Sequence, residues 1–242
     1  MNIAVIFAGG VGSRMHTKTK PKQFLDIHGK PIIVHTIEKF QYHSEIDGIV
    51  IACVKEWIPY LKQLIEHYNL TKVRKVVQGG STGQLSIFNG LVAAKEVVGA
   101  ERSIVLIHDG VRPLINDKLI SDNIASVKKY GSAITCVKVK ETVLVVSGEN
   151  QIEDIPERNN TRLARAPQSF WLDEILNMQK QAQAEEETNF IDSCSLAKHY
   201  GKKLYLVDGP SENIKITTPD DFYTMRALLD AKENAQIYGY EE

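Results

Sequence analysis

The chain has 242 residues, of which 43% are hydrophobic and 24% are charged, and its formal net charge is −1. The length suits one α/β domain, and the composition is ordinary for a globular protein. The near-neutral charge gives no general electrostatic reason to bind nucleic acid or an anionic membrane. The three cysteines lie far apart, which argues against a disulfide framework and a cysteine-based zinc site. Because there is neither a signal-peptide pattern nor an apolar run of the roughly 18 residues that a membrane span requires, we expect a cytoplasmic protein.

Short apolar runs alternate with segments of helical periodicity along the first 139 residues. Each apolar run predicts a buried strand, and each periodic segment predicts a helix. This alternation predicts an α/β fold in which a mostly parallel sheet is covered by helices on both faces. The predicted strands are 3–7, 48–53, 73–77, 103–107 and 133–139, and the predicted helices are 31–40, 57–67, 84–98 and 117–130.

The pattern changes after residue 139. Residues 140–165 are rich in charge and contain an apolar run at 143–146 and a turn-like stretch at 147–150. They predict two extended segments joined by a turn, projecting from the sheet of a single domain, 1–242. An arm this polar buries little in its own domain, so we expect it to pack against a second subunit. The remaining predicted elements are helices near 172–183, 193–199 and 219–232, a strand at 203–207, and a loosely held tail from residue 234.

A glycine-rich segment follows the first predicted strand. Glycines at positions 9, 10 and 12 allow backbone N–H groups to approach an anion. The segment is not a dinucleotide fingerprint, because Met15 stands where the third glycine is required, and it lacks the GK[ST] of a Walker A loop. Arg14 and Lys22 add two cations, which suit a triphosphate. The alternative is a tight strand-to-helix turn with ordinary surface cations.

Two more segments follow predicted strands. Residues 78–86 include a glycine pair and hydroxyl side chains that can hold a base or a ribose, or form a simple glycine turn with a helix cap. Residues 108–113 begin at the carboxyl end of a strand, the edge at which open α/β sheets bind ligands. Asp109 can bind Mg²⁺ there, or it can cap a turn and pair with Arg112. His108 is expected to be a packing residue.

Two weaker segments, 157–165 and 212–219, carry further cations. Taken singly, each cation in them, including Arg162 and Arg165, is expected to be a solvated surface residue.

Together the five segments closely resemble one family, the cytidylyltransferases that activate polyol phosphates. That family includes the methylerythritol phosphate, ribitol 5-phosphate and glycerol phosphate enzymes. The resemblance implies a Rossmann-like three-layer fold and a homodimer in which protruding β-arms are exchanged. The motifs that carry it occur in order over residues 1–220: AGGxGxRM from Ala8, PKQF from Pro21, the glycine pair 79–80, HDxxRP from His108, PQxF from Pro167 and NIKIT from Asn213.

The resemblance also implies a role for each site residue. Arg14 and Lys22 would stabilise the transition state at the α-phosphate of CTP, aided by Lys215, and Asp109 would bind Mg²⁺. The residues expected to bind the nucleotide are Phe7, Ala8, Gly9, Gly10, Gly80, Ser81, Thr82, Gly83, Gln84, Leu85 and Ser86.

The acceptor would be positioned by Arg158 of the partner subunit with Arg112, Thr142 and Asp109. The implied reaction transfers a cytidylyl group from CTP to a polyol phosphate and releases pyrophosphate. Ribitol 5-phosphate, giving CDP-ribitol for a cell-surface polymer, is favoured, because Phe24 and the Phe-Ala-Gly-Gly start of the glycine loop are more similar to ribitol-type enzymes.

Several alternatives stay open. The methylerythritol phosphate enzyme of isoprenoid synthesis and a glycerol phosphate enzyme share the same motifs. However, methylerythritol enzymes carry an acidic residue and an arginine after the glycine pair, where this chain has 81–83 as Ser-Thr-Gly. A sugar-phosphate enzyme that uses UTP or GTP, and a non-catalytic nucleotide-binding regulatory subunit, are the more distant alternatives. Retention of Arg14, Lys22 and Asp109 together argues against the regulatory subunit.

Overall fold

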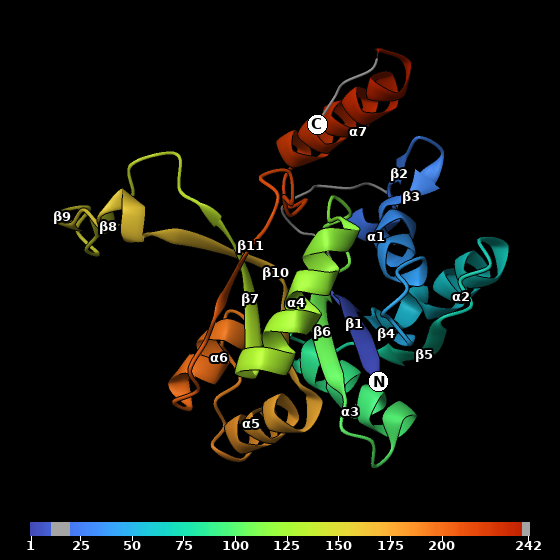
Figure 1. Ribbon diagram of the computed structural model, residues 1–242, viewed down its shortest axis with the longest axis horizontal. Helices are drawn as coiled ribbons and strands as arrows, with labels where there is room; N and C mark the ends of the chain where they lie inside the picture. Colours follow the sequence, from blue (N-terminus) through green and yellow to red (C-terminus); the bar gives the residue numbers. More distant parts are fainter. Residues whose placement is uncertain (11–19, 239–242) are drawn as a thin grey trace.

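The fold is built on one seven-stranded sheet, in a computed structural model that describes residues 1–10 and 20–238. The strand order is β11-β7-β10-β6-β1-β4-β5 (Figure 1). Every neighbouring pair is parallel except those of β10, which runs antiparallel to β6 and β7. The predicted mostly parallel sheet is therefore confirmed. The strands are β1 Asn2–Ala8, β4 Gly48–Cys53, β5 Val73–Gln78, β6 Ile104–Asp109, β7 Ser132–Lys138, β10 Arg162–Trp171 and β11 Leu206–Asp208.

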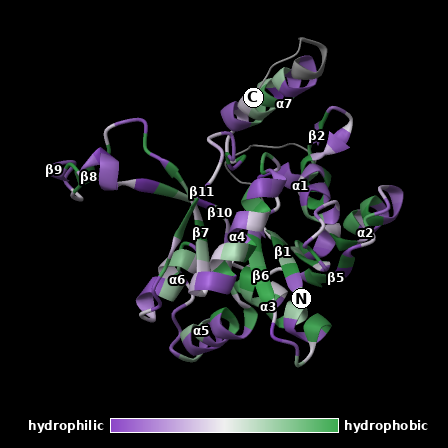
Figure 2. Ribbon diagram, viewed as in Figure 1, coloured by the Kyte–Doolittle hydropathy of each residue, from purple (hydrophilic) through white to green (hydrophobic). Residues whose placement is uncertain are grey.

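Helices cover both faces of this sheet, which makes the three layers. Side chains alternate along a strand, so Ala4 and Ile6 of β1 pack with α1, α2 and α4, whereas Ile3 and Val5 pack with α3, α5 and α6. Apolar residues are concentrated in the central strands (Figure 2). The helices are α1 Ile32–Gln41, α2 Ile58–His67, α3 Gly83–Val98, α4 Asp117–Tyr130, α5 Leu172–Ala184, α6 Ser193–His199 and α7 Pro219–Tyr238.

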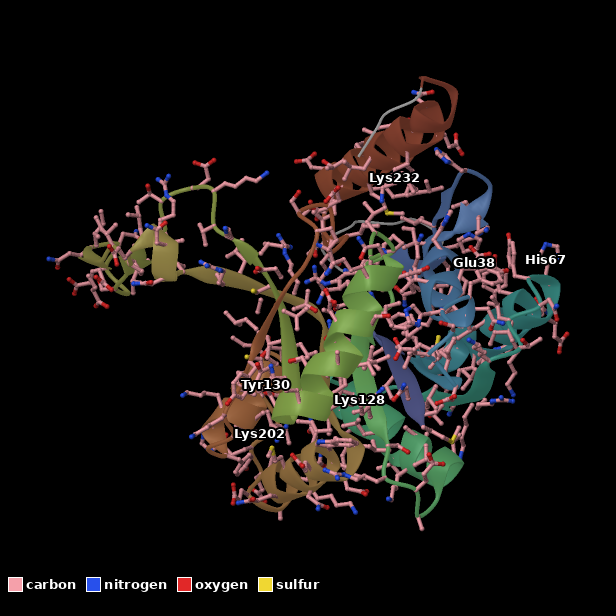
Figure 3. All side chains as sticks on the ribbon, in the orientation of Figure 1. Glu38, His67, Lys128, Tyr130, Lys202 and Lys232 are labelled. Atoms are coloured by element: carbon pink, nitrogen blue, oxygen red, sulfur yellow. The ribbon has the colours of Figure 1, made fainter. Side chains whose placement is uncertain are left out.

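The outer faces of the helices are polar. Lys128 near the end of α4 and His67 at the end of α2 are exposed on the outside of the molecule (Figure 3). Within the part of the chain that the structure describes, no helix is both long and apolar enough to cross a lipid bilayer.

The predicted arm projects away from the sheet (Figure 1). Its tip is an antiparallel pair of short strands, β8 Val145–Val146 and β9 Ile152–Asp154. It also carries a short 3-10 helix, Arg158–Asn160, before the chain returns to the sheet as β10. The two extended segments joined by a turn are thus confirmed.

Besides shifts in element bounds, such as β11 at 206–208 where 203–207 was predicted, three features differ from the prediction. The second half of β10 is a central strand, although Pro167 lacks the N–H that such a strand normally donates. The strand accommodates the proline through a register shift between Ala164 and Gln168. A small hairpin of β2 Asp26–Ile27 and β3 Lys30–Pro31 was not predicted. Finally, α7 continues to Tyr238, so the tail expected to be loosely held from Asn234 is helical at its start.

Candidate active site

A cavity of about 660 Å³ lies at the carboxyl ends of β1, β4, β5 and β6. We call it the large cavity. It brings together most of the residues that were predicted to bind a nucleotide, from segments that are far apart in the chain. The predicted site residues that line it are Phe7, Ala8, Gly9, Gly10, Lys22, Gly80, Ser81, Thr82, Gly83, Ser86, Asp109 and Lys215.

Ser86 fixes the second glycine segment of the large cavity and lies close against the first. Its hydroxyl oxygen accepts a hydrogen bond from the backbone N–H of Gly80 at 3.0 Å and donates to the carbonyl of Thr82 at 2.9 Å. A Cβ atom added at Gly9 would lie 2.4 Å from this oxygen. Position 9 therefore requires glycine, because the first loop approaches Ser86 so closely.

Gln23 holds the first glycine loop in place through its side-chain amide. No role was predicted for this residue. It is 1% exposed, and its side-chain N–H₂ donates to the carbonyls of Ala8 at 2.9 Å and Gly10 at 3.2 Å. It sits in the 3-10 helix Lys22–Phe24, so it also anchors the neighbouring Lys22 beside the loop. The PKQF motif was the available signal for this role. Arg14 lies outside the described residues.

Asp109 ends β6 and joins two cations. Its carboxylate lies 2.7 Å from Nε of Arg112 and 2.6 Å from Nζ of Lys215. Burial alone would raise the pKa of the Asp109 carboxyl, but the charges of Arg112 and Lys215 outweigh it and hold that pKa at about 2. The group is therefore an anion at any physiological pH. Arg112 is itself 8% exposed and donates to the carbonyl of Asn213 at 3.0 Å.

His108 has no exposed surface and lines neither of the two cavities described here. Its Nε2 lies 2.9 Å from the carbonyl oxygen of Arg112, so that nitrogen carries the hydrogen. Burial lowers the pKa of the imidazole to about 4, so the ring is neutral at neutral pH. The packing role expected from the sequence agrees with this position.

A second cavity of about 250 Å³, the small cavity, adjoins the large one. The two share Phe7, Gly83, Asp109 and Lys215 in their walls. The small cavity is lined in addition by Arg112 and by Arg165, which is half-buried instead of being the solvated surface residue that was expected. Asp109 and Lys215 thus stand at the junction of the two cavities.

Four predicted residues line neither cavity. The Gln84 side chain is buried and bonds to the carbonyl of Glu187 and the N–H of Phe190, both at 2.9 Å. Leu85 packs against Gly80, whose added Cβ would lie 2.2 Å from that of the leucine. Thr142 and Arg158 belong to the arm, where they are joined by a hydrogen bond of 3.2 Å.

The large cavity also has walls that were not predicted. Val54, Lys55 and Glu56 follow β4, and the last two lie in the 3-10 helix Lys55–Trp57. No glycine or known motif marks this segment. The one available signal was that the segment follows a parallel strand, because open α/β sheets bind ligands at the edge where such strands end.

Comparison with known proteins gives one consistent family. The family model described as IspD, 2-C-methyl-D-erythritol 4-phosphate cytidylyltransferase, matches residues 2–231. A ribitol-5-phosphate cytidylyltransferase of Streptococcus agalactiae serotype Ia is 56% identical over 239 residues, covering 99% of this chain and 100% of that protein. A 2-C-methyl-D-erythritol 4-phosphate cytidylyltransferase of Clostridium novyi is 39% identical over 230 residues, with 95% and 96% covered. The crystal structure of 4-diphosphocytidyl-2C-methyl-D-erythritol synthase from Anaerococcus prevotii is similar with a TM-score of 0.82 at 29% identity, covering 95% of this chain and 96% of that one.

Proposed function

The chain belongs to the IspD family of cytidylyltransferases, and we propose that it transfers a cytidylyl group from CTP to ribitol 5-phosphate, giving CDP-ribitol and pyrophosphate. The observation that carries this proposal is the pair of adjoining cavities with Asp109 and Lys215 at their junction. A nucleotide in the large cavity and a small phosphate ester in the other would meet at that point. The choice of ribitol rests on the 56% identity to the streptococcal ribitol-5-phosphate enzyme, against 39% for the clostridial methylerythritol enzyme.

The chemistry needs little from the protein beyond charge and position. An oxygen of the acceptor phosphate attacks the α-phosphorus of CTP, a new P–O bond forms, and the bond to the departing pyrophosphate breaks. A phosphate monoester is already an anion at neutral pH, so the reaction requires no general base. The enzyme must offset the repulsion between two anions and stabilise the charge of the transition state. Lys22 and Lys215 in the wall of the large cavity meet that need.

We propose Mg²⁺ as the cofactor, with Asp109 as its protein ligand. Among the described residues, no group of three or more His, Cys, Asp or Glu side chains could hold a metal ion by itself. A single carboxylate suits Mg²⁺, which is usually bound by one or two carboxylates together with substrate phosphates and water. Both oxygens of Asp109 already accept from cations, but each retains a lone pair. Bound there, the ion would neutralise charge on the triphosphate.

A panel of acceptors tests the proposed function. Ribitol 5-phosphate, 2-C-methyl-D-erythritol 4-phosphate and glycerol 3-phosphate are each incubated with CTP and Mg²⁺, and pyrophosphate release is scored as kcat/KM. We expect ribitol 5-phosphate to exceed both others by at least about tenfold. A higher kcat/KM for the methylerythritol substrate would assign the chain to isoprenoid synthesis. No release with any acceptor would favour a nucleotide-binding protein without catalysis.

We propose further that the protein is a homodimer joined through the arm. Apolar side chains are unusually exposed there: Val146 by 53%, Ile152 by 52% and Ile155 by 56%. Such side chains on a projecting hairpin are typical of a surface that another subunit covers. A dimer would also give Thr142 and Arg158, which line neither cavity in one chain, a route to the acceptor of the partner subunit.

Replacing both Val146 and Ile152 by aspartate should separate the subunits. The two residues pair across the hairpin, so the change puts two charges at the centre of the proposed interface. We expect sedimentation to show a shift from dimer to monomer at micromolar concentration and kcat/KM to fall by at least about tenfold, because the acceptor would lose Arg158 of the partner subunit. Glu153→Gln, on the same strand, is the matched control and should remain dimeric. A wild-type protein that sediments as a monomer would contradict the proposal.

A further inference from the structure

Arg165 occupies an unusual position on β10. The pairing of β10 with β7 runs from Ala164, opposite Cys136, to Gln168, opposite Ile134. Residues 165–167 therefore stand opposite Thr135 alone, and this part of the strand leaves the regular ladder. At this bulge Arg165 lines the small cavity, and it does not line the large one.

The Arg165 guanidinium has no carboxylate partner among the described residues. Its Nε is buried and has no hydrogen-bond partner. No carboxylate oxygen of the described residues lies within 4.0 Å of a nitrogen of this guanidinium. Burial and the neighbouring charge of Arg112 both lower the pKa of Arg165, while Asp221 acts on it only at longer range. Guanidinium nevertheless stays protonated in proteins, so this is a charged donor held beside an empty volume.

The two carboxylates in the wall of the small cavity are already occupied. Asp109 pairs with Arg112 and Lys215. Asp192 caps α6 through the N–H of Ser195 and accepts from the side chain of Gln168, each at 2.8 Å. Neither is left to neutralise Arg165. The wall carries three cations and two carboxylates, so it suits a ligand that supplies hydrogen-bond acceptors.

A second polar side chain in the wall of the small cavity has no hydrogen-bond partner. Ser193, the first residue of α6, is 1% exposed, lines the small cavity, and its buried hydroxyl has no hydrogen-bond partner in the described structure. Leaving a buried polar group unpaired is costly, and such groups in native proteins usually bond to a ligand or to water. Two unpaired polar groups, one from β10 and one from α6, thus belong to the wall of the same cavity.

We propose that Arg165 and Ser193 bind the hydroxyl groups at the far end of the polyol phosphate acceptor, and that Arg165 thereby selects acceptors by length. This inference rests on the proposed function. The acceptor phosphate must meet the α-phosphate of CTP at the junction formed by Asp109 and Lys215. The rest of the acceptor then extends into the small cavity. The volume of this cavity, about 250 Å³, is below the range of about 300–1,000 Å³ typical of pockets for drug-sized ligands, so it suits a small acceptor. A longer polyol chain reaches Arg165, and a three-carbon acceptor does not.

Arg165→Met tests this assignment, because it removes the donors and keeps an unbranched side chain. With ribitol 5-phosphate we expect the KM of the acceptor to rise about tenfold to a hundredfold, the loss typical of a charge-assisted hydrogen bond. The kcat and the KM for CTP should stay within about twofold, and Arg165→Lys should recover part of the loss. With glycerol 3-phosphate, measured as KM or as an inhibition constant, the variant should match the wild type. Arg74→Met, which removes an exposed arginine from β5 outside both cavities, is the matched control.

Equal losses for both acceptors, or a KM for CTP that rises with that of the acceptor, would overturn the assignment and make Arg165 a structural residue. Calorimetric binding of ribitol 5-phosphate separates this test from that of the proposed function. If the wild type released no pyrophosphate, the proposed function would be wrong, but the binding measurement would still decide whether Arg165 contacts ribitol 5-phosphate. Binding at least about tenfold weaker in Arg165→Met would still support the site, and equal binding, or no binding to either protein, would overturn it.

Discussion

Lys22→Ala is expected to lower kcat by about a hundredfold while leaving the fold intact. Lys22 lines the large cavity beside the glycine loop, and the buried Gln23 next to it fixes its backbone against that loop. Its charge would stabilise the negative charge that builds up on the phosphates in the transition state. Because the side chain is only partly buried, its loss leaves no cavity in the core. Pyrophosphate release at saturating CTP and acceptor measures the effect.

Lys20→Ala is the matched control for this variant. Lys20 pairs with Asp26 at 3.3 Å and lines neither cavity, so its removal should change kcat by less than about twofold. Thermal unfolding should give nearly the same Tm for both variants and the wild type. Turnover of Lys22→Ala within about threefold of the wild type would show that the assigned role is wrong.

Asp109→Asn is expected to reduce kcat/KM by about a thousandfold and also to destabilise the fold. The substitution removes the proposed Mg²⁺ ligand and the anion between two cations at the junction of the cavities. It leaves the buried Arg112 without a counter-charge, and breaking a buried pair in this way typically costs about 3–5 kcal/mol of unfolding free energy. Asp122→Asn, which breaks the surface pair of Asp122 with Lys118, should change neither quantity measurably. An Asp109→Asn variant as active as the wild type would contradict both proposed roles.

The pH dependence of this stability difference follows from the low pKa of Asp109. Because the folded-state pKa, about 2, lies below the ordinary value of 3.8, the ionised carboxyl stabilises the fold at all pH values above the ordinary one. That contribution is lost as the pH falls towards the folded-state pKa. Denaturant titration should therefore give a constant difference between wild type and Asp109→Asn from about pH 5 to 8, and a smaller one below about pH 4. A difference that disappears near neutral pH would contradict the ion-pair geometry.

The sequence predicts an element well when local signals decide it. Helix α4 matches its predicted bounds, because Asn116 caps its start by accepting from the N–H of Leu119 at 2.9 Å and Gly131 ends it with a φ of 83°. Strand β4 likewise matches, since it is an uninterrupted apolar run. The second half of β10 could not be predicted in the same way. Its place between β6 and β7 depends on pairing with residues far away in the chain, and Pro167 is a local signal against it.

In the candidate site, too, the features set by local sequence could be predicted and those set by distant contacts could not. Glycines at the ends of strands predicted the loops of the large cavity, because backbone approach is a local property. The sequence could not predict which side chains of the first turn of α3 face that cavity. Successive residues of a helix point to different sides, and the partners that hold Gln84 in the interior, Glu187 and Phe190, lie about a hundred residues away. The place of Arg165 in the wall of the small cavity could not be predicted for a similar reason, because Arg165 lies at the register shift in β10.

The most direct test of the proposed cytidylyl transfer follows the α-phosphate of CTP. CTP radiolabelled at that position is incubated with the protein, Mg²⁺ and ribitol 5-phosphate, and the products are separated by chromatography. We predict that the label moves into CDP-ribitol in a one-to-one ratio with the pyrophosphate released, and that none becomes attached to the protein. Label that stays in CTP with ribitol 5-phosphate, or that accumulates on the protein, would contradict direct transfer at the junction of the two cavities.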